Sequence, residues 1–335
     1  MPGAPGTSEL LAISVIAAIA SAALTFALLP LLRRHVLAHP NVRSSHRVST
    51  PQGGGIAVIA ATVGASLAFG AVANVAMLGL LVVATIGIAI VGAADDLWTI
   101  GVVPRLLLHG IAVGVAIASL PSEWRVLPVL PWWFERALLL LAGVWFVNLT
   151  NFMDGIDLMT VAEFVPMMAA LALFGMLGAL PAEAIIVAVA LCGGLVGFAP
   201  FNWPVARIFL GDVGSLPIGL LAGWLLMLLA CNGHLAAALI LPLYYLADAT
   251  ITLLRRIARG EPFWQAHRSH FYQRATDHGW TVPTIVARVF AGNIALAAIA
   301  AATIAWPGLQ IGAAALAAAA ALVAWLLHDL ARGRS

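Results

Sequence analysis

Charged residues are scarce in this sequence, lysine is absent, and cysteine occurs only twice. Charged side chains make up 9% of the 335 residues, whereas soluble domains carry about 25%, so an ordinary soluble protein is excluded. Cys192 and Cys231 both lie in apolar runs, which argues against a disulfide framework and against a cysteine metal site. The alternating segments of about ten residues that build membrane β-barrels are also missing.

Long apolar runs fill the chain instead. Hydrophobic residues make up 63% of the sequence, and the mean hydropathy is +1.04. Apolar runs of roughly 20 residues predict membrane-spanning helices, because a helix satisfies its own backbone hydrogen bonds inside lipid. We therefore predict an all-α polytopic membrane protein in which residues 1–335 form a single domain. About eleven spans are expected, near 9–32, 53–71, 75–94, 105–120, 134–150, 160–179, 183–200, 214–231, 234–254, 285–305 and 309–328.

Two local signals bear on the ends of this array. Trp306, Pro307 and Gly308 form a turn signal that separates the last two predicted spans. The N-terminal MPGAPGTSEL has no basic residue before the first apolar run. A cleaved signal peptide is therefore not expected, and the first run is predicted to be a span.

The distribution of arginine predicts the orientation. With an odd number of spans, fourteen of the sixteen arginines fall on one side, and only Arg125 and Arg136 fall on the other. The positive-inside rule places the first side in the cytoplasm, with the N-terminus outside and the C-terminus inside. The predicted cytoplasmic loops then lie near 33–52, 95–104, 148–159, 200–213 and 255–284.

The stretch VNLTNFMDGIDLM at 147–159 is unusually polar for a connection between two apolar runs. On a helix, Asn148, Asn151 and Asp154 would line one face, and Asp157 would follow one step further round. A simple turn does not need four amide or carboxylate groups, so this stretch is a candidate for a functional site.

Other acidic residues map to the same predicted membrane face. Asp95 and Asp96 close one span, Asp212 precedes another, and Asp248 lies toward the cytoplasmic end of a third. A single aspartate at a helix end is most often a cap or a solvated terminus. However, Asp95 and Asp96 stand at a helix C-terminus, where the helix dipole disfavours anions, and an ionisable group near lipid costs a few kcal/mol.

Several acidic clusters at one level need a shared positive partner. Mg²⁺ with a phosphorylated substrate is the natural one, because Mg²⁺ takes a few carboxylate or amide oxygens together with phosphate oxygens. Glycines flank Asp212, so backbone N–H groups there can approach a phosphate. A plain glycine-rich turn is the alternative for that stretch.

The basic loop at 255–284 is the expected counterpart of the acidic clusters. It holds His267, Arg268, His270 and Arg274, with no carboxylate or thiolate at metal-ligand spacing, so a metal site is disfavoured. Two interpretations stay open for these residues: an anchor on anionic lipid headgroups and an anion-binding loop. The loop's aromatic residues either stack on a sugar or base or belong to the interfacial belt, namely Phe263, Trp264, Phe271 and Tyr272.

Five motifs, in order along nearly the whole chain, resemble those of the polyprenyl-phosphate N-acetylhexosamine-1-phosphate transferases. This membrane family includes the phospho-N-acetylmuramoyl-pentapeptide transferase of peptidoglycan synthesis. The motifs are HPNVRSSH with PQGGG, GAADDLWTIG, NLTNFMDGID, FNWPVARIFLGDVGS and HRSHFYQRA. The last one is most similar to members that initiate O-antigen and related surface glycans.

The resemblance implies a reaction. An N-acetylhexosamine-1-phosphate passes from a UDP-sugar to polyprenyl (undecaprenyl) phosphate, which releases UMP and leaves a lipid-linked diphosphate sugar. It also implies a bacterial inner membrane location, an active site on the cytoplasmic face and Mg²⁺ as cofactor, with Mn²⁺ as an alternative. No nucleic-acid partner is expected. The oligomeric state stays open, with a homodimer as one alternative. The identity of the sugar stays open among UDP-GlcNAc, UDP-QuiNAc, UDP-FucNAc and other UDP-N-acetyl sugars.

The family pattern also implies residue roles. Asn151 and Asp212 match Mg²⁺ ligands, and Asp95 with Asp96 matches the pair that orients or deprotonates the lipid phosphate. Asp154 and Asp157 match acidic positions of catalysis or nucleotide binding, with covalent attack and direct attack both open. Substrate contacts are expected from Arg43, His46, Asn148, Arg207, His267, Arg268, His270 and Arg274.

Three positions depart from the family pattern. Ala38 stands where an acidic residue is common, Leu158 stands where glycine is usual, and Arg207 replaces a common lysine. The first two are expected to alter loop geometry, and the third keeps the charge.

Three rival functions fit the sequence less well than the transferase does. An ion-coupled secondary transporter of an anionic or nucleotide-sugar substrate would place its aspartates near the membrane midplane, whereas these aspartates sit at span ends. The long aspartate-rich signature of CDP-alcohol phosphotransferases is absent. A non-catalytic scaffold would leave the five motifs unexplained.

Overall fold

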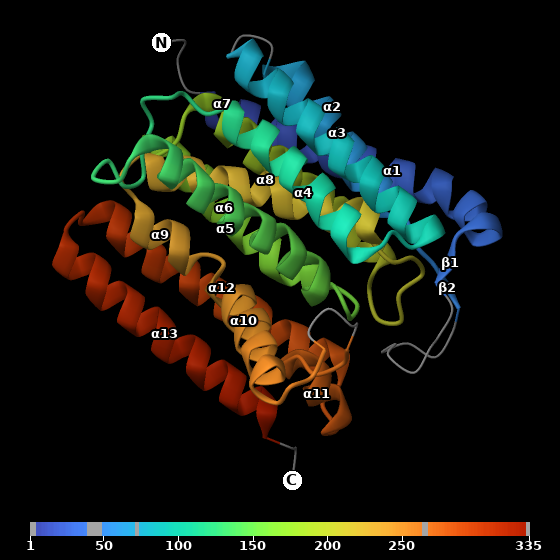
Figure 1. The fold of residues 1–335 in the computed structure, drawn as a ribbon. Coiled ribbons are helices and arrows are strands. Elements are labelled where there is room, and N and C mark those ends of the chain that lie inside the picture. Colours follow the sequence, from blue (N-terminus) through green and yellow to red (C-terminus); the bar gives the residue numbers. More distant parts are fainter. Residues whose placement is uncertain (1–4, 39–48, 71–73, 263–266, 333–335) are drawn as a thin grey trace.

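A computed structural model describes residues 5–38, 49–70, 74–262 and 267–332 of the chain (Figure 1). Its long helices are α1 Thr7–His35, α2 Gly55–Gly70, α3 Val75–Trp98, α4 Val102–Ala118, α5 Trp132–Met153, α6 Met159–Met176, α7 Ala182–Phe198, α8 Asp212–Cys231, α10 Leu243–Ala258, α12 Val282–Ala305 and α13 Leu309–Ala331. The short elements are β1 Leu37–Ala38, β2 Thr50–Pro51, the 3₁₀ turn Ala199–Phe201, α9 Leu235–Ile240 and α11 Phe271–Asp277. The two strands pair antiparallel.

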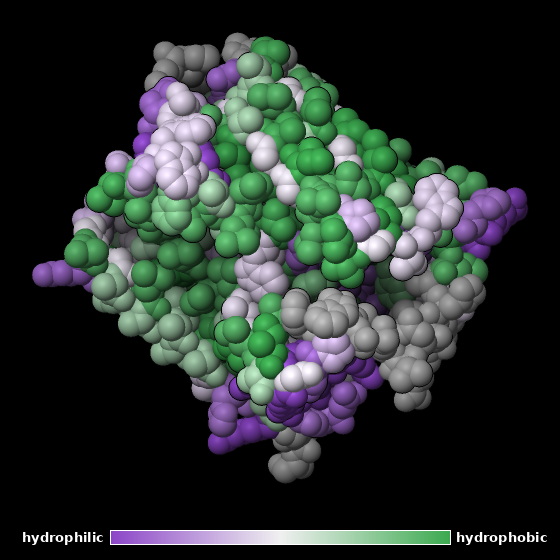
Figure 2. Space-filling model, viewed as in Figure 1, coloured by the Kyte–Doolittle hydropathy of each residue, from purple (hydrophilic) through white to green (hydrophobic). Residues whose placement is uncertain are grey.

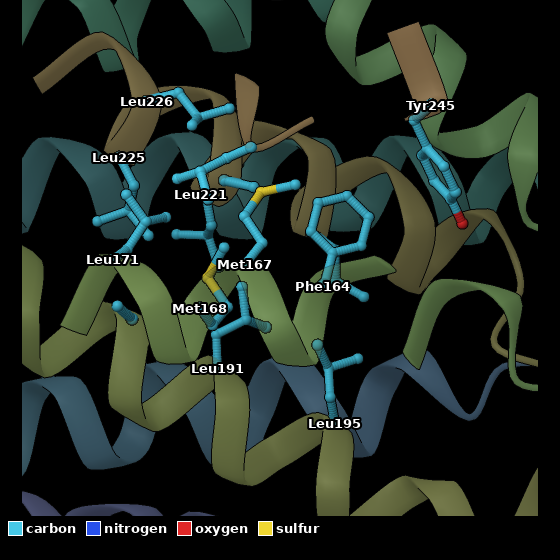
Figure 3. Packing of buried hydrophobic residues seen from close by; sticks show 14 of the residues in the cluster. Phe164, Met167, Met168, Leu171, Leu191, Leu195, Leu221, Leu225, Leu226 and Tyr245 are labelled. Carbon is cyan, nitrogen blue, oxygen red and sulfur yellow. The ribbon is translucent and has the colours of Figure 1, made fainter. Parts of the chain in front are cut away.

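Helix α8 forms the centre of the bundle, and almost every residue along it is buried. Figure 1 shows α1 to α4 on one side of it and α12 with α13 on the other. In Figure 3, Met167 and Leu171 of α6, Leu191 of α7 and Leu221 of α8 point toward one another in the core. This packing fixes α8 against its neighbours. Because α8 begins at Asp212, the same packing positions this predicted site residue.

The outer surface of the bundle is apolar. Large hydrophobic side chains such as Phe26, Ile90 and Leu141 stand exposed on different helices, and Figure 2 shows apolar side chains over much of the viewed face. A water-soluble monomer rarely exposes such a surface. The arrangement is that of a polytopic membrane protein whose helices face lipid.

Helices occur at every predicted span, but not all of them are long. Among the described residues, eight helices are long and apolar enough to cross a membrane, while α2 and α4 are apolar but shorter. The turn at Trp306 to Gly308 separates α12 from α13, as predicted. The total of eleven spans and the orientation stay predictions.

The predicted span at 234–254 is interrupted in the structure, and whether it crosses the membrane stays a prediction. The chain forms α9, breaks at Leu241 and Pro242, and resumes as α10. Proline has no backbone N–H and clashes with the preceding turn, which explains a break there. After the break, α10 runs beside α5, and the indole N–H of Trp145 donates to Thr250 Oγ1 at 3.2 Å.

Candidate active site

The carboxylate of Asp96 caps helix α8 from another helix. Its two oxygens accept hydrogen bonds from the backbone N–H groups of Asp212, at 3.1 Å, and Val213, at 3.2 Å. Gly211 precedes α8 and has no side chain to cap it, so Asp96 satisfies donors that would otherwise be unpaired. The positive end of the α8 dipole also favours a carboxylate at this position. Asp96 therefore joins the end of α3 to the start of α8.

This junction depends on glycines at the points of closest approach. A Cβ on Gly92 of α3 would lie 2.3 Å from the carbonyl oxygen of Asp212. Likewise, a Cβ on Gly55 of α2 would lie 2.2 Å from the Cα of Gly214 in α8. Only glycine leaves room for the three helix ends to meet, so these residues set the position of Asp212.

The second member of the aspartate pair has different partners. Asp95 forms an ion pair with Arg105 of α4, at 2.8 Å between Oδ2 and Nη1, and accepts a hydrogen bond from the Ile100 N–H. Asp95 also interacts with the carboxylate of Asp212. The side chain of Asn151 reaches the same carboxylate, and its amide donates to Ser215 Oγ at 3.0 Å. The two predicted metal ligands, Asn151 and Asp212, are thus side by side.

Helix α5 ends at Met153, so Asp154 and Asp157 lie on a loop and not on the helical face that the spacing suggested. Asp154 accepts a hydrogen bond from the Thr160 hydroxyl, and Asp157 accepts one from the Ala206 N–H at 3.0 Å. Burial raises the pKa of Asp154 to about 7; the nearby carboxylates of Asp96 and Asp157 add to the rise, and the Thr160 bond opposes it. Asp154 is thus close enough to Asp96 for the two carboxylates to interact electrostatically.

Leu158 ends this loop in a left-handed backbone conformation, with φ of 62°. Its N–H donates to Asn202 Oδ1 at 2.6 Å, and its side chain is buried. The left-handed region favours glycine because a Cβ is crowded there. The structure thus gives a physical reason why glycine is usual at this position.

A pair of substitutions measures the cost of this conformation. Leu158→Ala and Leu158→Gly both delete the buried side chain, so we expect both to lower stability by about 2–5 kcal/mol. Because glycine relieves the strain, Leu158→Gly should be the more stable of the two by about 1 kcal/mol. Thermal unfolding of both variants in the same detergent measures the difference. Greater stability of the alanine variant would contradict the strained geometry.

Asp248 performs a similar capping role for α11. This fully buried carboxylate of α10 accepts hydrogen bonds from the N–H groups of Phe271, at 3.0 Å, and Tyr272, at 3.3 Å. The His270 ring bonds the same carboxylate through Nδ1 at 3.2 Å. The Tyr272 hydroxyl then donates to the Phe152 carbonyl at 3.0 Å. Through these contacts α11 is docked against the loop that carries Asp154.

The basic residues of the last loop have separate environments. The His267 ring packs on the His270 ring at 4.8 Å between centroids, and burial, His270 and Arg256 lower the pKa of His267 to about 4. At neutral pH His267 is therefore an uncharged group. Arg268 pairs with Asp277 at 3.1 Å, and Arg274 is exposed. The structure brings these side chains together at α11, beside the aspartate site.

The remaining predicted substrate contacts are Arg207, Asn148, Arg43 and His46. Arg207 is exposed and lies over the Phe201 ring at 5.5 Å. Asn148 is buried, donates to the Val144 carbonyl at 2.8 Å and lies beside the His109 ring, so its described partners are protein groups. Arg43 and His46 lie outside the described residues.

Sequence reasoning missed two residues next to the site. Arg105 is the ion-pair partner of Asp95, and His109 follows it by one helical turn, fully buried against Asn148. The signal in the sequence was their i, i+4 spacing just after GAADDLWTIG, in a segment that otherwise reads as an apolar span. Arg105 therefore helps to hold Asp95 in place.

The donor set suits a hard divalent cation. Asp95, Asp96, Asp154 and Asp212 supply carboxylate oxygens and Asn151 an amide oxygen, which are the ligand types of Mg²⁺. Among the described ion pairs, neither Asp212 nor Asp154 has a cationic partner. The described residues do not place three or more His, Cys, Asp or Glu side chains together in metal-binding geometry.

Comparisons with known proteins identify relatives of this site. A sequence profile described as Glycosyl transferase family 4 matches residues 77–230. That range contains Asp95, Asp96, Asn151, Asp154 and Asp212. The resemblance to this family is confirmed. The protein is accordingly a glycosyl-1-phosphate transferase by class.

Individual relatives of the transferase agree with the profile at low identity. A probable undecaprenyl-phosphate N-acetylglucosaminyl 1-phosphate transferase of Bacillus subtilis is 26% identical over 72% of this chain and 69% of its own length. The decaprenyl-phosphate N-acetylglucosaminephosphotransferase of Mycobacterium tuberculosis is 29% identical over 56% of this chain and 52% of its own length. The Mycobacterium leprae protein with that name is 27% identical over 77% of this chain and 74% of its own length.

Proposed function

We propose that this transferase moves an N-acetylhexosamine-1-phosphate from a UDP-sugar to polyprenyl phosphate, releasing UMP. The observation that carries the proposal is the convergence of five aspartates and Asn151 where α3 and α5 end and α8 begins. A site at helix ends lets a buried isoprenoid tail present its phosphate to a soluble nucleotide sugar. The relatives named above are transferases for undecaprenyl or decaprenyl phosphate and N-acetylglucosamine, which supports a polyprenyl phosphate acceptor and a donor of that sugar type.

The proposed transfer depends more on positioning the two anionic substrates than on activating the nucleophile. A phosphate monoester is already largely ionised at neutral pH, because its second pKa is about 6, so no strong base is needed to make the nucleophile. The difficulty is bringing anions together, and catalysis of such transfers is mostly positioning and electrostatics. Asp95 and Asp96, held by Arg105 and by the start of α8, are proposed to position the lipid phosphate.

Asn151 and Asp212 are the residues proposed to hold Mg²⁺ or Mn²⁺. When bound, the cation would neutralise charge on the diphosphate. Asp154 and Asp157 are proposed to act in catalysis or in nucleotide binding. His267, Arg268, His270 and Arg274 are proposed to face the donor; His267 does so as a hydrogen-bonding group, because its pKa is low.

Arg268→Ala should raise the KM for the nucleotide sugar by about tenfold or more and change the KM for the lipid little, because a charge-assisted contact is worth about 1.5–3 kcal/mol. Steady-state kinetics with each substrate varied in turn measures this. Asp277→Asn is the matched control, since Asp277 is the ion-pair partner of Arg268. Equal effects on both substrates, or equal effects of both variants, would indicate a structural role.

We further propose that the product initiates a surface glycan such as O-antigen, from an active site on the cytoplasmic face of a bacterial inner membrane. The fourteen arginines on one predicted side support this orientation. A panel of UDP-sugars identifies the sugar donor. The mass of the purified protein shows whether it forms a homodimer.

The deciding experiment measures UMP release by purified protein with undecaprenyl phosphate and Mg²⁺, across UDP-GlcNAc, UDP-QuiNAc, UDP-FucNAc and related sugars. Release that requires both lipid and metal is the expected result, and the best donor names the sugar. Folded protein that binds UDP-sugars but releases no UMP with any of them would overturn the proposal and favour a transporter.

A further inference from the structure

A pocket rich in arginine lies where α10 ends and α11 begins. It has a volume of about 310 Å³ and is lined by Thr252, Arg255, Arg256, Arg259, Arg268, Ser269 and Arg274. Figure 2 shows hydrophilic side chains gathered over this end of α10 and α11, below the apolar surface. Three of the arginines come from α10 and its C-cap, and no role was assigned to them above.

The described acids neutralise only part of this charge. Glu261 pairs with Arg256 at 3.3 Å and with Arg259 at 4.0 Å, and Asp277 pairs with Arg268. Arg255 has no carboxylate partner among the described residues and lies over the Phe271 ring at 4.7 Å. Since arginine stays protonated, five guanidinium groups face two carboxylates. The pocket keeps an excess of three positive charges.

Buried donors in the pocket wall also lack acceptors. Arg256 is only 8% exposed, and its Nε has no hydrogen-bond partner in the described part of the chain. The Nε of Arg268 is buried and unpartnered in the same way. A buried donor without an acceptor is costly, and a ligand oxygen would supply the missing acceptor. Charge excess and free guanidinium donors together match the geometry that recognises phosphate.

We propose that this pocket binds a phosphate group, held by Arg255, Arg256 and Arg259 of the α10 end as well as by α11. Two sources have the required chemistry. Leu254 and Ile257 are exposed beside the arginines on α10, an arrangement that suits the acyl chains and headgroup of a membrane lipid. The proposed role of Arg268 and Arg274 instead suits the phosphates of a soluble nucleotide sugar, and that source rests on the proposed function.

The test compares Arg255→Gln with Arg259→Gln, combined in one variant, against the unmodified protein. Both side chains are exposed, so the fold should survive, and thermal unfolding checks this. Binding is measured with two probes, pyrophosphate in solution and phosphatidylglycerol in nanodiscs, with phosphatidylcholine as the neutral lipid. We expect about tenfold weaker binding of one probe, because charge-assisted contacts are lost.

Arg33→Gln with Arg34→Gln is the matched control, because it removes two exposed arginines from the end of α1 and leaves the pocket intact. Loss of phosphatidylglycerol binding in the pocket variant alone supports a lipid source. Loss of pyrophosphate binding alone supports a soluble source. Unchanged binding of both probes, or equal losses in the control, would overturn the proposal. Both binding measurements are independent of catalysis. A result against the phosphate pocket can therefore be distinguished from a result against the transferase proposal.

Discussion

Asp212→Asn should reduce UMP release by about 10²–10³-fold or more, the range expected when a group that stabilises reacting charge is lost. The substitution keeps the shape of the side chain but removes the charge proposed to bind the metal. The fold should persist, because Asp96 caps α8 through the backbone N–H of residue 212, which the substitution keeps. UMP release at saturating substrates, with thermal unfolding in parallel, measures the two effects.

Asp329→Asn is the matched control for this result. It removes a carboxylate near the end of α13, where Asp329 pairs with Arg288 and lies outside the aspartate site. Activity should stay close to that of the unmodified protein. Turnover by Asp212→Asn at the unmodified rate would rule out Asp212 as a metal ligand and would remove the main support for the proposed site.

Gly92→Ala should be nearly as damaging, although it adds a single methyl group on a different helix. The new Cβ would lie 2.3 Å from the Asp212 carbonyl oxygen, so α3 and the start of α8 must separate. Small displacements of a catalytic group cost about 10²-fold in rate, and we expect a loss of that order. UMP release at saturating substrates gives the rate, and thermal unfolding shows how much stability is lost with it.

Gly87→Ala on the same helix provides the comparison. A Cβ at Gly87 meets nothing within 4 Å, so the same change in helix propensity occurs without a clash. Alanine is a better helix former than glycine, and this variant should keep its activity and its stability. Similar losses in both variants would mean that the effect comes from α3 in general and not from the contact with Asp212.

Local patterns in the sequence sufficed to find the helices and the site-bearing segments. Apolar runs determine where helices form, because each run satisfies its backbone within itself, and the turn at Trp306 to Gly308 acts locally as well. The gathering of Asp95, Asp96, Asp154 and Asp212 at one end also followed from their positions at span ends. The break at Pro242 does not follow from proline alone, because Pro30, Pro166 and Pro217 lie inside α1, α6 and α8 without ending them.

The sequence by itself therefore determined the helical membrane architecture, the polar end of the bundle and the resemblance to the transferase family. Tertiary structure alone decided what each side chain at that end does. Asp96 accepts its hydrogen bonds from residues 116 and 117 positions away, and Asp248 from residues 23 and 24 positions away, in other helices. The arginine pocket likewise joins the end of α10 with residues at the start of α11. Such contacts depend on how helices pack against each other, which periodicity within one helix does not encode.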